Sequence, residues 1–270
     1  MCRVLTVSRS GYYTWAKHIR SIRQKENERL LLHIKEAYKK GRGTYGSPRV
    51  TAELKSKGIT CGNNRVARLM KINGIKAKTK RRFKATQKFK HGFLVADNLL
   101  NQRFESNEVN KVWVSDITFI RTREGWMYLA AILDVFNRQI IGWSMDSKLS
   151  HELLADALSK ALRQRKPEPG VLFHSDRGTQ YTSYAFRDLM ERNGFIQSMS
   201  SSGNCYDNAL MESFFHTLKT ELIYFEKYRT RREARGSIFE YIELFYNRVR
   251  RHSALNYCSP AEYERNASVT

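Results

Sequence analysis

Three acidic side chains have types and spacing that could support phosphoryl transfer. Asp116 interrupts an apolar, strand-like stretch, Asp176 follows a second such stretch, and Glu212 lies in a helical pattern. A stretch of 35 residues separates Asp176 from Glu212. Carboxylates without a cluster of cysteines or histidines select hard, oxygen-preferring ions, so the set predicts Mg²⁺ or Mn²⁺. Two such ions, about 3.5–4 Å apart, can activate a nucleophile and stabilise the leaving oxygen of an in-line displacement.

The helical pattern around Glu212 predicts a cation on the same side of the helix. Apolar residues recur at every fourth position from Leu210 and predict the buried face. Glu212, His216 and Lys219 fall together on the adjoining face. Two helical turns, about 10 Å, separate Glu212 from Lys219. We therefore expect the carboxylate and the ammonium to share one groove, where Lys219 binds a DNA phosphate and His216 is a further candidate DNA contact.

Other polar residues nearby have structural interpretations that compete with a functional one. Asp134 follows an expected strand and is better interpreted as a turn cap than as a rival metal ligand. Asp207 is interpreted as an N-cap or helix-dipole partner of the helix that carries Glu212. His174 is expected either to orient water or phosphate or to pack at a strand end. Arg177 is expected either to contact DNA or to stabilise its own loop.

The elements that would position the carboxylates predict a mixed α/β core. Strands are expected at 112–120, 127–134, 139–144, 171–174 and 195–199, and helices at 150–165 and 183–193. Three consecutive strands followed by alternating helices and strands predict a five-stranded mixed sheet flanked by helices. On this arrangement Asp116, Asp176 and Glu212 can meet at one edge of the sheet.

Almost all of the excess positive charge lies in the N-terminal part of the chain. The 270 residues carry a formal net charge of +22, and residues 1–100, with 25 basic and five acidic side chains, contribute +20 of it. A basic segment joined to a nearly neutral one predicts a polyanion-binding module beside a domain with another task.

Within this basic segment, two short helical patterns predict a helix-turn-helix. The first follows the helical spacing of residues 24–39, begins with Ser47 as its N-cap and stops near residue 58; the second covers 63–74, with Asn63 or Asn64 as its cap. The second pattern carries three basic residues, Arg65, Arg68 and Lys71. We expect these three side chains to contact DNA; a plain helical hairpin with a solvated surface is the alternative.

Changes in composition divide the chain into four expected segments. They are a helix-turn-helix region at 1–75, a basic linker at 76–105, a catalytic core at 106–225 and a helical tail at 226–270. The longest apolar run near the middle has seven residues, whereas a membrane span needs about 20, so a soluble protein is expected. The four cysteines form no C-x-x-C motif, which argues against a disulfide framework and a cysteine zinc site.

Several separated motifs resemble the catalytic core of bacterial insertion-sequence transposases of the open-reading-frame-B type. They are residues 114–118 (VSDIT), 174–181 (HSDRGTQY) and 207–215 (DNALMESFF), with Lys219 at the basic position of the family's D, D(35)E pattern. Residues 45–49 resemble the helix-turn-helix that precedes this core, and residues 246–260 resemble the family's C-terminal tail.

This resemblance implies a DDE transposase with a retroviral-integrase-like, RNase-H-like core. It implies that Asp116, Asp176 and Glu212 hold two Mg²⁺ (or Mn²⁺) ions while water, and then a DNA 3′-hydroxyl, attacks a phosphodiester. The implied partners are terminal inverted repeats, target DNA, further copies of the chain on DNA, and the upstream helix-turn-helix protein of the same element, as a fusion or partner. The implied location is the bacterial cytoplasm, at the nucleoid and away from membranes.

Two other function classes remain open. A non-catalytic regulator would bind DNA through residues 47–74 and would not need the three carboxylates. An RNase-H-like nuclease would cut DNA without joining it, using the same carboxylates.

Overall fold

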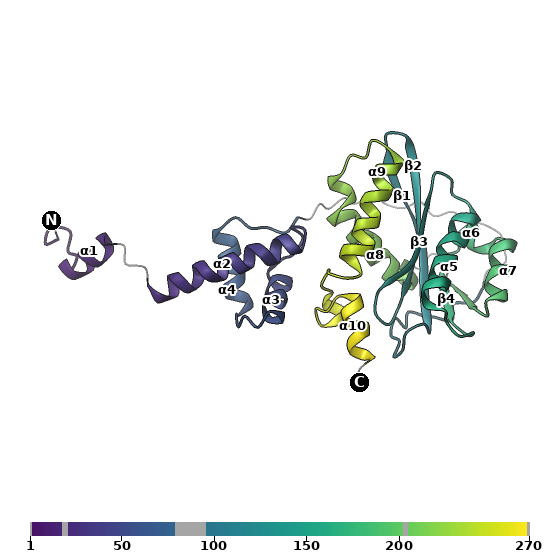
Figure 1. Ribbon diagram of the computed structural model, residues 1–270, viewed down its shortest axis with the longest axis horizontal. Coiled ribbons are helices and arrows are strands. Elements are labelled where there is room, and N and C mark those ends of the chain that lie inside the picture. Colours follow the sequence, from purple (N-terminus) through teal and green to yellow (C-terminus); the bar gives the residue numbers. More distant parts are fainter. Residues whose placement is uncertain (1, 18–20, 79–95, 202–204, 269–270) are drawn as a thin grey trace. The chain divides into compact units, whose positions relative to one another are not determined.

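The computed structural model describes residues 2–17, 21–78, 96–201 and 205–268 (Figure 1). The chain divides into two compact units, Met1–Lys78 and Thr79–Thr270. Most of the basic linker expected at 76–105 lies outside the described residues. Within the described ranges, no helix is both long enough and apolar enough to cross a membrane.

The N-terminal unit is entirely helical. Its helices are α1 (Arg9–Ala16), α2 (Ile22–Lys40), α3 (Ser47–Ser56) and α4 (Asn63–Ile72). Ile34, Leu54 and Val66 have no exposed surface and form a core shared by α2, α3 and α4. The two short helices expected from the sequence are therefore present as α3 and α4, and α2 packs against both.

The expected N-caps of α3 and α4 are wrong, by one position for Ser47 and by one or two for Asn63 or Asn64. Gly46 and Gly62 occupy the N-cap positions, because their carbonyl oxygens accept the first intrahelical hydrogen bonds, from Val50 and Val66. The Asn63 side chain instead accepts a hydrogen bond from the Thr51 hydroxyl of α3, at 3.4 Å. It thus links the two helices rather than capping one of them.

The second unit contains the predicted five-stranded mixed sheet. The strands are β1 (Val112–Thr122), β2 (Gly125–Asp134), β3 (Ile140–Asp146), β4 (Leu172–Ser175) and β5 (Ile196–Met199), in the order β3-β2-β1-β4-β5. β1 is antiparallel to β2 and parallel to β4, and β4 is parallel to β5. β1, which carries Asp116, is thus the central strand.

Helices cover both faces of this sheet (Figure 1). On one side lie α5 (His151–Arg165), the short α6 (Thr179–Thr182) and α7 (Tyr184–Arg192); on the other lie α8 (Ala209–Glu221), α9 (Arg231–Phe239) and a π-helical segment, Glu240–Tyr246. The chain ends with α10 (Pro260–Ala267). Gly142 of β3 faces α5, and a Cβ atom at this position would clash with the backbone and side chain of that helix.

A buried ion pair holds the C-terminal end of α8 against the following segments. The Arg250 guanidinium donates two hydrogen bonds to the Glu221 carboxylate, at 2.8 and 2.7 Å, and the Tyr241 hydroxyl donates a third at 2.8 Å. The side chains of Arg250 and Glu221 are only 5% and 6% exposed. Because α8 also carries Glu212 and Lys219, this ion pair helps to determine where those two residues lie.

We expect Arg250→Ala to lower the free energy of unfolding by about 3–5 kcal/mol, because it leaves the Glu221 carboxylate buried without its cation. Urea denaturation followed by tryptophan fluorescence measures this, since three of the four tryptophans lie in the second unit. The double variant Glu221→Gln, Arg250→Met is the control and should recover most of the loss. A loss below about 1 kcal/mol for Arg250→Ala would show that the pair does not hold α8.

Candidate active site

Asp116 lies on β1, and Asp176 directly follows β4, the adjacent parallel strand. Val114 of β1 pairs with His174 of β4. Each aspartate lies two residues beyond its member of this pair, and the charge of Asp176 acts on Asp116, so the two side chains lie near each other where β4 ends. The structure therefore brings together the first two acidic residues that the sequence singles out.

Electrostatics place Glu212 and Lys219 in the same neighbourhood. Burial and then the charge of Asp176 raise the pKa of Asp116 to about 8; Glu212 adds to this rise, whereas the Ile117 N–H and Lys219 oppose it. The Ile117 N–H donates to Asp116 Oδ1 at 2.7 Å. Partial desolvation also raises the pKa of Asp176 and that of Glu212. Three carboxylates and one ammonium thus influence one another at this edge.

Helix α8 presents its polar face as the sequence predicts. Glu212 and His216 are exposed, and Lys219 is half-buried. Desolvation lowers the pKa of Lys219, and the charge of Asp116 opposes that effect. Phe214 and Leu218 are buried on the core face, whereas Leu210, also expected there, is only partly buried because it lies in the first turn of the helix.

Hydrogen bonds next to the carboxylates join residues that lie inside the three quoted motifs but to which the sequence assigned no individual role. The Asn208 side-chain amide, which immediately precedes α8, donates to the Ser115 carbonyl at 3.1 Å. The Ser115 and Tyr181 hydroxyls lie 2.8 Å apart. Both contacts fix the residue next to Asp116. The sequence signal for this support is that all three residues fall within the motifs around Asp116, Asp176 and Glu212.

His174 is packed at the strand end, one of its two expected roles. Its Nδ1 lies 2.9 Å from the Ser198 hydroxyl and its Nε2 lies 3.2 Å from the Ser200 hydroxyl. Burial lowers the pKa of His174 to about 4, so the ring is neutral near pH 7. Arg177 is exposed, and its Nε donates to the Ser200 carbonyl at 2.6 Å, which ties the loop after Asp176 to β5.

The two remaining aspartates have structural roles. Asp134 is confirmed as a turn cap: it is fully buried, and its carboxylate accepts hydrogen bonds from the N–H groups of Asn110 and Phe136. Asp207 is not the N-cap of α8, because Asn208 occupies that position. The Asp207 carboxylate instead accepts hydrogen bonds from the Ser201 N–H and from two side-chain amides, those of Asn98 and Gln102. It thus connects the segment before β1 to the segment before α8.

The donor set at this edge suits hard divalent cations. Its three candidate ligands are carboxylates, and their mutual repulsion would be relieved by positive charge. Among the described residues, no three His, Cys, Asp or Glu side chains lie close enough to hold one ion together. A single ion held by all three carboxylates would therefore need Asp116, Asp176 and Glu212 to move closer to one another.

The basic residues of α4 differ in how exposed they are and in whether they already bind another helix. Arg68 and Lys71 are exposed. The Arg65 guanidinium instead binds α2, donating to the Asn27 side chain at 2.9 Å and to Glu26 at 3.2 Å. Of the three predicted DNA contacts, Arg65 is thus the one whose donors already have protein partners.

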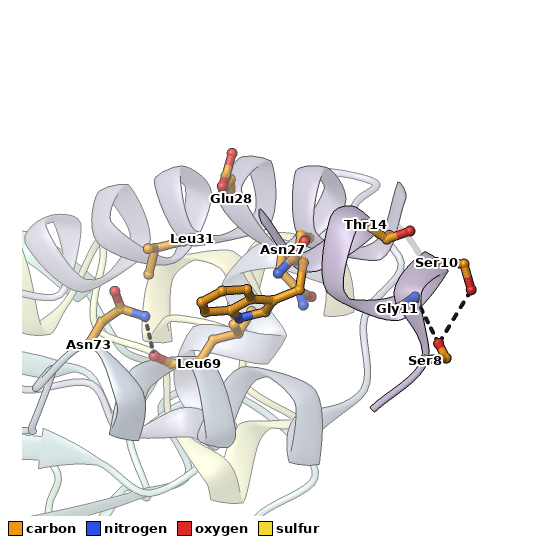
Figure 2. A pocket seen from close by; sticks show the side chains of 11 residues that line it. Ser8, Ser10, Gly11, Thr14, Asn27, Glu28, Leu31, Leu69 and Asn73 are labelled. Carbon is orange, nitrogen blue, oxygen red and sulfur yellow. Dashed lines mark hydrogen bonds between the residues drawn. The ribbon is translucent and has the colours of Figure 1, made fainter. Parts of the chain in front are cut away.

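A separate hollow lies in the N-terminal unit, between α1, α2 and α4 (Figure 2). It encloses about 1000 Å³ and is lined by residues that include Thr14, Leu31 and Leu69. The hollow belongs to a different unit from the three carboxylates and is not the candidate active site.

Comparisons with known proteins agree with this division of the chain. Residues 25–83 match the family described as an HTH-like domain, and residues 106–205 and 212–267 match two families described as integrase core domains. A catalytic core of HTLV-2 integrase in complex with magnesium aligns with 57% of this chain and 96% of its own, at 14% identity and a TM-score of 0.45. This structural similarity is low, so the assignment rests on the sequence families and relatives.

Two relatives align along nearly the entire chain. An insertion element IS600 uncharacterized 31 kDa protein from Shigella sonnei is 48% identical over 263 residues, or 97% of each chain. The transposase InsF for insertion sequence IS3A from Escherichia coli (strain K12) is 42% identical over 266 residues, which cover 98% of this chain and 92% of the relative. The chain therefore belongs to the insertion-sequence transposases that combine an HTH-like domain with an RNase-H-like, DDE-type integrase core.

Proposed function

We propose that this chain cuts and joins DNA at the ends of an insertion sequence, with Asp116, Asp176 and Glu212 as the catalytic metal ligands. Family membership supports the reaction class. The observation that carries the residue assignment is the placement of Asp116 on β1 and of Asp176 directly after β4, the adjacent parallel strand, within reach of the charge of Glu212.

The carboxylate donors and their repulsion favour two Mg²⁺ or Mn²⁺ ions. Such ions, when bound, would supply Lewis-acid stabilisation of the attacking and leaving oxygens of the phosphodiester. Asp116, on the central strand, is the most rigidly held ligand, because β1 is paired on both sides just before it. Glu212 would join the two aspartates from α8, and its charge already acts on Asp116.

The remaining polar residues of this edge would bind the DNA backbone. Lys219 lies two turns beyond Glu212, about 10 Å along α8, which is too far for metal ligation and suits a phosphate next to the cut. His216 and Arg177 would contact the same strand. Water, and later a 3′-hydroxyl, would displace the leaving oxygen in line, with no covalent bond between enzyme and DNA.

The N-terminal unit would supply recognition of duplex DNA. Arg68 and Lys71 on α4 would contact the terminal inverted repeats, whereas Arg65 would fix α4 on α2. Further copies of the chain, and the upstream helix-turn-helix protein of the same element, would complete the assembly on donor and target DNA at the nucleoid.

Asp116→Asn, Asp176→Asn and Glu212→Gln should each lower strand joining by about 10²-fold or more and leave DNA affinity nearly unchanged, because each removes charge stabilisation but no phosphate contact. The assay joins labelled duplexes with the element's terminal repeats to a plasmid in Mg²⁺. Asp188→Asn on α7 is the matched control. A variant that joins at the wild-type rate would remove its residue from the ligand set, and wild-type cleavage without joining would identify a nuclease.

Asp116 should also make stability depend on pH. Its pKa is about 8 in the folded chain against an ordinary 3.8, so folded Asp116 keeps a proton that the unfolded chain releases. Without metal, stability should therefore fall as pH rises from about 4 to 8, and less steeply in Asp116→Asn. At pH 8, Mg²⁺ at about 100 times its Kd should raise the Tm of the wild type by about 5–10 °C, and that of the variant by less. If wild type and Asp116→Asn showed the same dependence of Tm on pH and on Mg²⁺ in calorimetry, the assignment of Asp116 as a metal ligand would be contradicted.

The helix-turn-helix assignment predicts different effects for two arginines of α4. Arg68→Ala should reduce the log–log salt slope of duplex binding by about 0.9, because one phosphate contact is lost. Arg65→Ala should reduce the slope by less than half of that, since its donors already bind Asn27 and Glu26. Arg192→Ala, in the other unit, is the control for loss of one positive charge. Equal slopes for Arg68→Ala and wild type would mean that α4 does not contact the backbone.

A further inference from the structure

We infer that exposed aromatic side chains on the β1–β2 hairpin form a stacking platform for one unpaired base of the DNA strand that crosses the carboxylates. The platform consists of Phe119, Trp126 and Tyr128. The inference rests on the proposed function for the identity of the bound strand, but its test does not depend on catalysis.

The strand register places the three rings on one face of the hairpin. Phe119 pairs with Tyr128, and Arg121 pairs with Trp126. The Phe119 ring contacts both other rings edge to face, with centroids 5.9 Å from Trp126 and 6.5 Å from Tyr128. The rings therefore support one another and present one continuous aromatic surface.

The outer part of this surface is open to solvent. Phe119 is 55% exposed and Trp126 is 51% exposed. Tyr128 is partly buried, because it packs against the hydrophobic core between the sheet and α5. On the same face of β1, Trp113 is completely buried, so the exposure begins only where the hairpin extends beyond the covering helices. Two large rings left half-exposed on a rigid hairpin are more typical of a binding surface than of a core.

Lys219 connects the platform to the carboxylates. Its Nζ lies 5.8 Å from the centroid of the Phe119 ring, and its pKa responds to the charge of Asp116. Phe119 is three residues beyond Asp116, about 10 Å along the strand, so the two side chains project from opposite faces of β1. Beyond Val114, β1 is no longer paired with β4, and Lys219 interacts with both residues there. A phosphate bound by Lys219 would thus lie where a strand could pass from the carboxylates on one face to the rings on the other.

The charges around the platform favour a nucleic-acid occupant. Arg121 lies on the same face and is exposed, as is Arg123 at the turn. Arg231 reaches the tip of the hairpin, where its N–H donates to Glu124 and its Nε donates to the Trp126 carbonyl. Aromatic rings surrounded by cations are typical of surfaces that bind single strands through base stacking and phosphate contacts.

The test compares two short probes that differ only in their bases. The full chain is titrated, in EDTA, with a single-stranded thymidine hexanucleotide and with an abasic hexanucleotide of equal charge. We expect wild type to bind the thymidine probe about tenfold more tightly. Phe119→Ala and Trp126→Ala should each bring this ratio close to one, while affinity for the abasic probe stays unchanged.

Three further variants separate stacking from other effects. Phe119→Tyr keeps an aromatic ring and should keep the ratio, whereas Phe119→Leu keeps apolar bulk and should lose it. Tyr184→Ala removes an 85% exposed aromatic ring on α7 and should behave as wild type. Thermal melts of every variant show whether it is folded.

An unchanged ratio in folded Phe119→Ala and Trp126→Ala would overturn the inference. It would also be overturned if these variants changed only the oligomeric mass in light scattering, since the rings would then pack against a second copy. Failure here leaves the carboxylate assignment intact. If Asp116→Asn instead joined strands at the wild-type rate while the base preference was retained, only the proposed catalytic residues would be overturned.

Discussion

The carboxylates of Asp116 and Asp176 repel each other across two adjacent parallel strands, and partial burial strengthens this repulsion because less water screens it. Folding alone does not favour such an arrangement. Burial first, and the charge of Asp176 second, raise the pKa of Asp116 to about 8. Divalent cations would turn the same arrangement into a favourable one, which is why we interpret it as a metal site rather than as a structural cluster.

The surrounding structure holds these charges in place with neutral contacts. Ser115 is tied to Tyr181 and Asn208, and the neutral ring of His174 lies between Ser198 and Ser200. None of these groups adds a positive charge that would compete with a cation for the carboxylates. The buried ion pair of Glu221 with Arg250 lies at the C-terminal end of α8, where it fixes the helix without neutralising Glu212.

Much of the fold was predictable from the sequence, because hydrophobic periodicity reports directly on which face of a strand or helix is buried. The five strands, the helix that carries Glu212 and the paired short helices all follow from it. Hydrogen bonds between segments that are distant in the sequence could not be predicted from this periodicity. Asn63 and Asp207 are residue types that often cap helices, but each binds a segment that periodicity cannot place beside it.

The same limit applies to the candidate site. Spacing and residue type single out Asp116, Asp176 and Glu212, but they do not reveal that Arg65 binds α2. The aromatic platform was also missed, because Phe119 and Trp126 are far more typical of a buried strand than of an exposed one. Only the register of β1 and β2 places these rings together, and only the side chain of Lys219 connects them to the helix that carries Glu212.

The most direct test of the account is anomalous diffraction from crystals of the full chain grown with Mn²⁺. The account predicts two peaks about 3.5–4 Å apart, with Asp116 bound to both ions and with Asp176 and Glu212 each bound to one or both. Peaks at other residues, or no peak at these carboxylates at a saturating concentration of Mn²⁺, would contradict it.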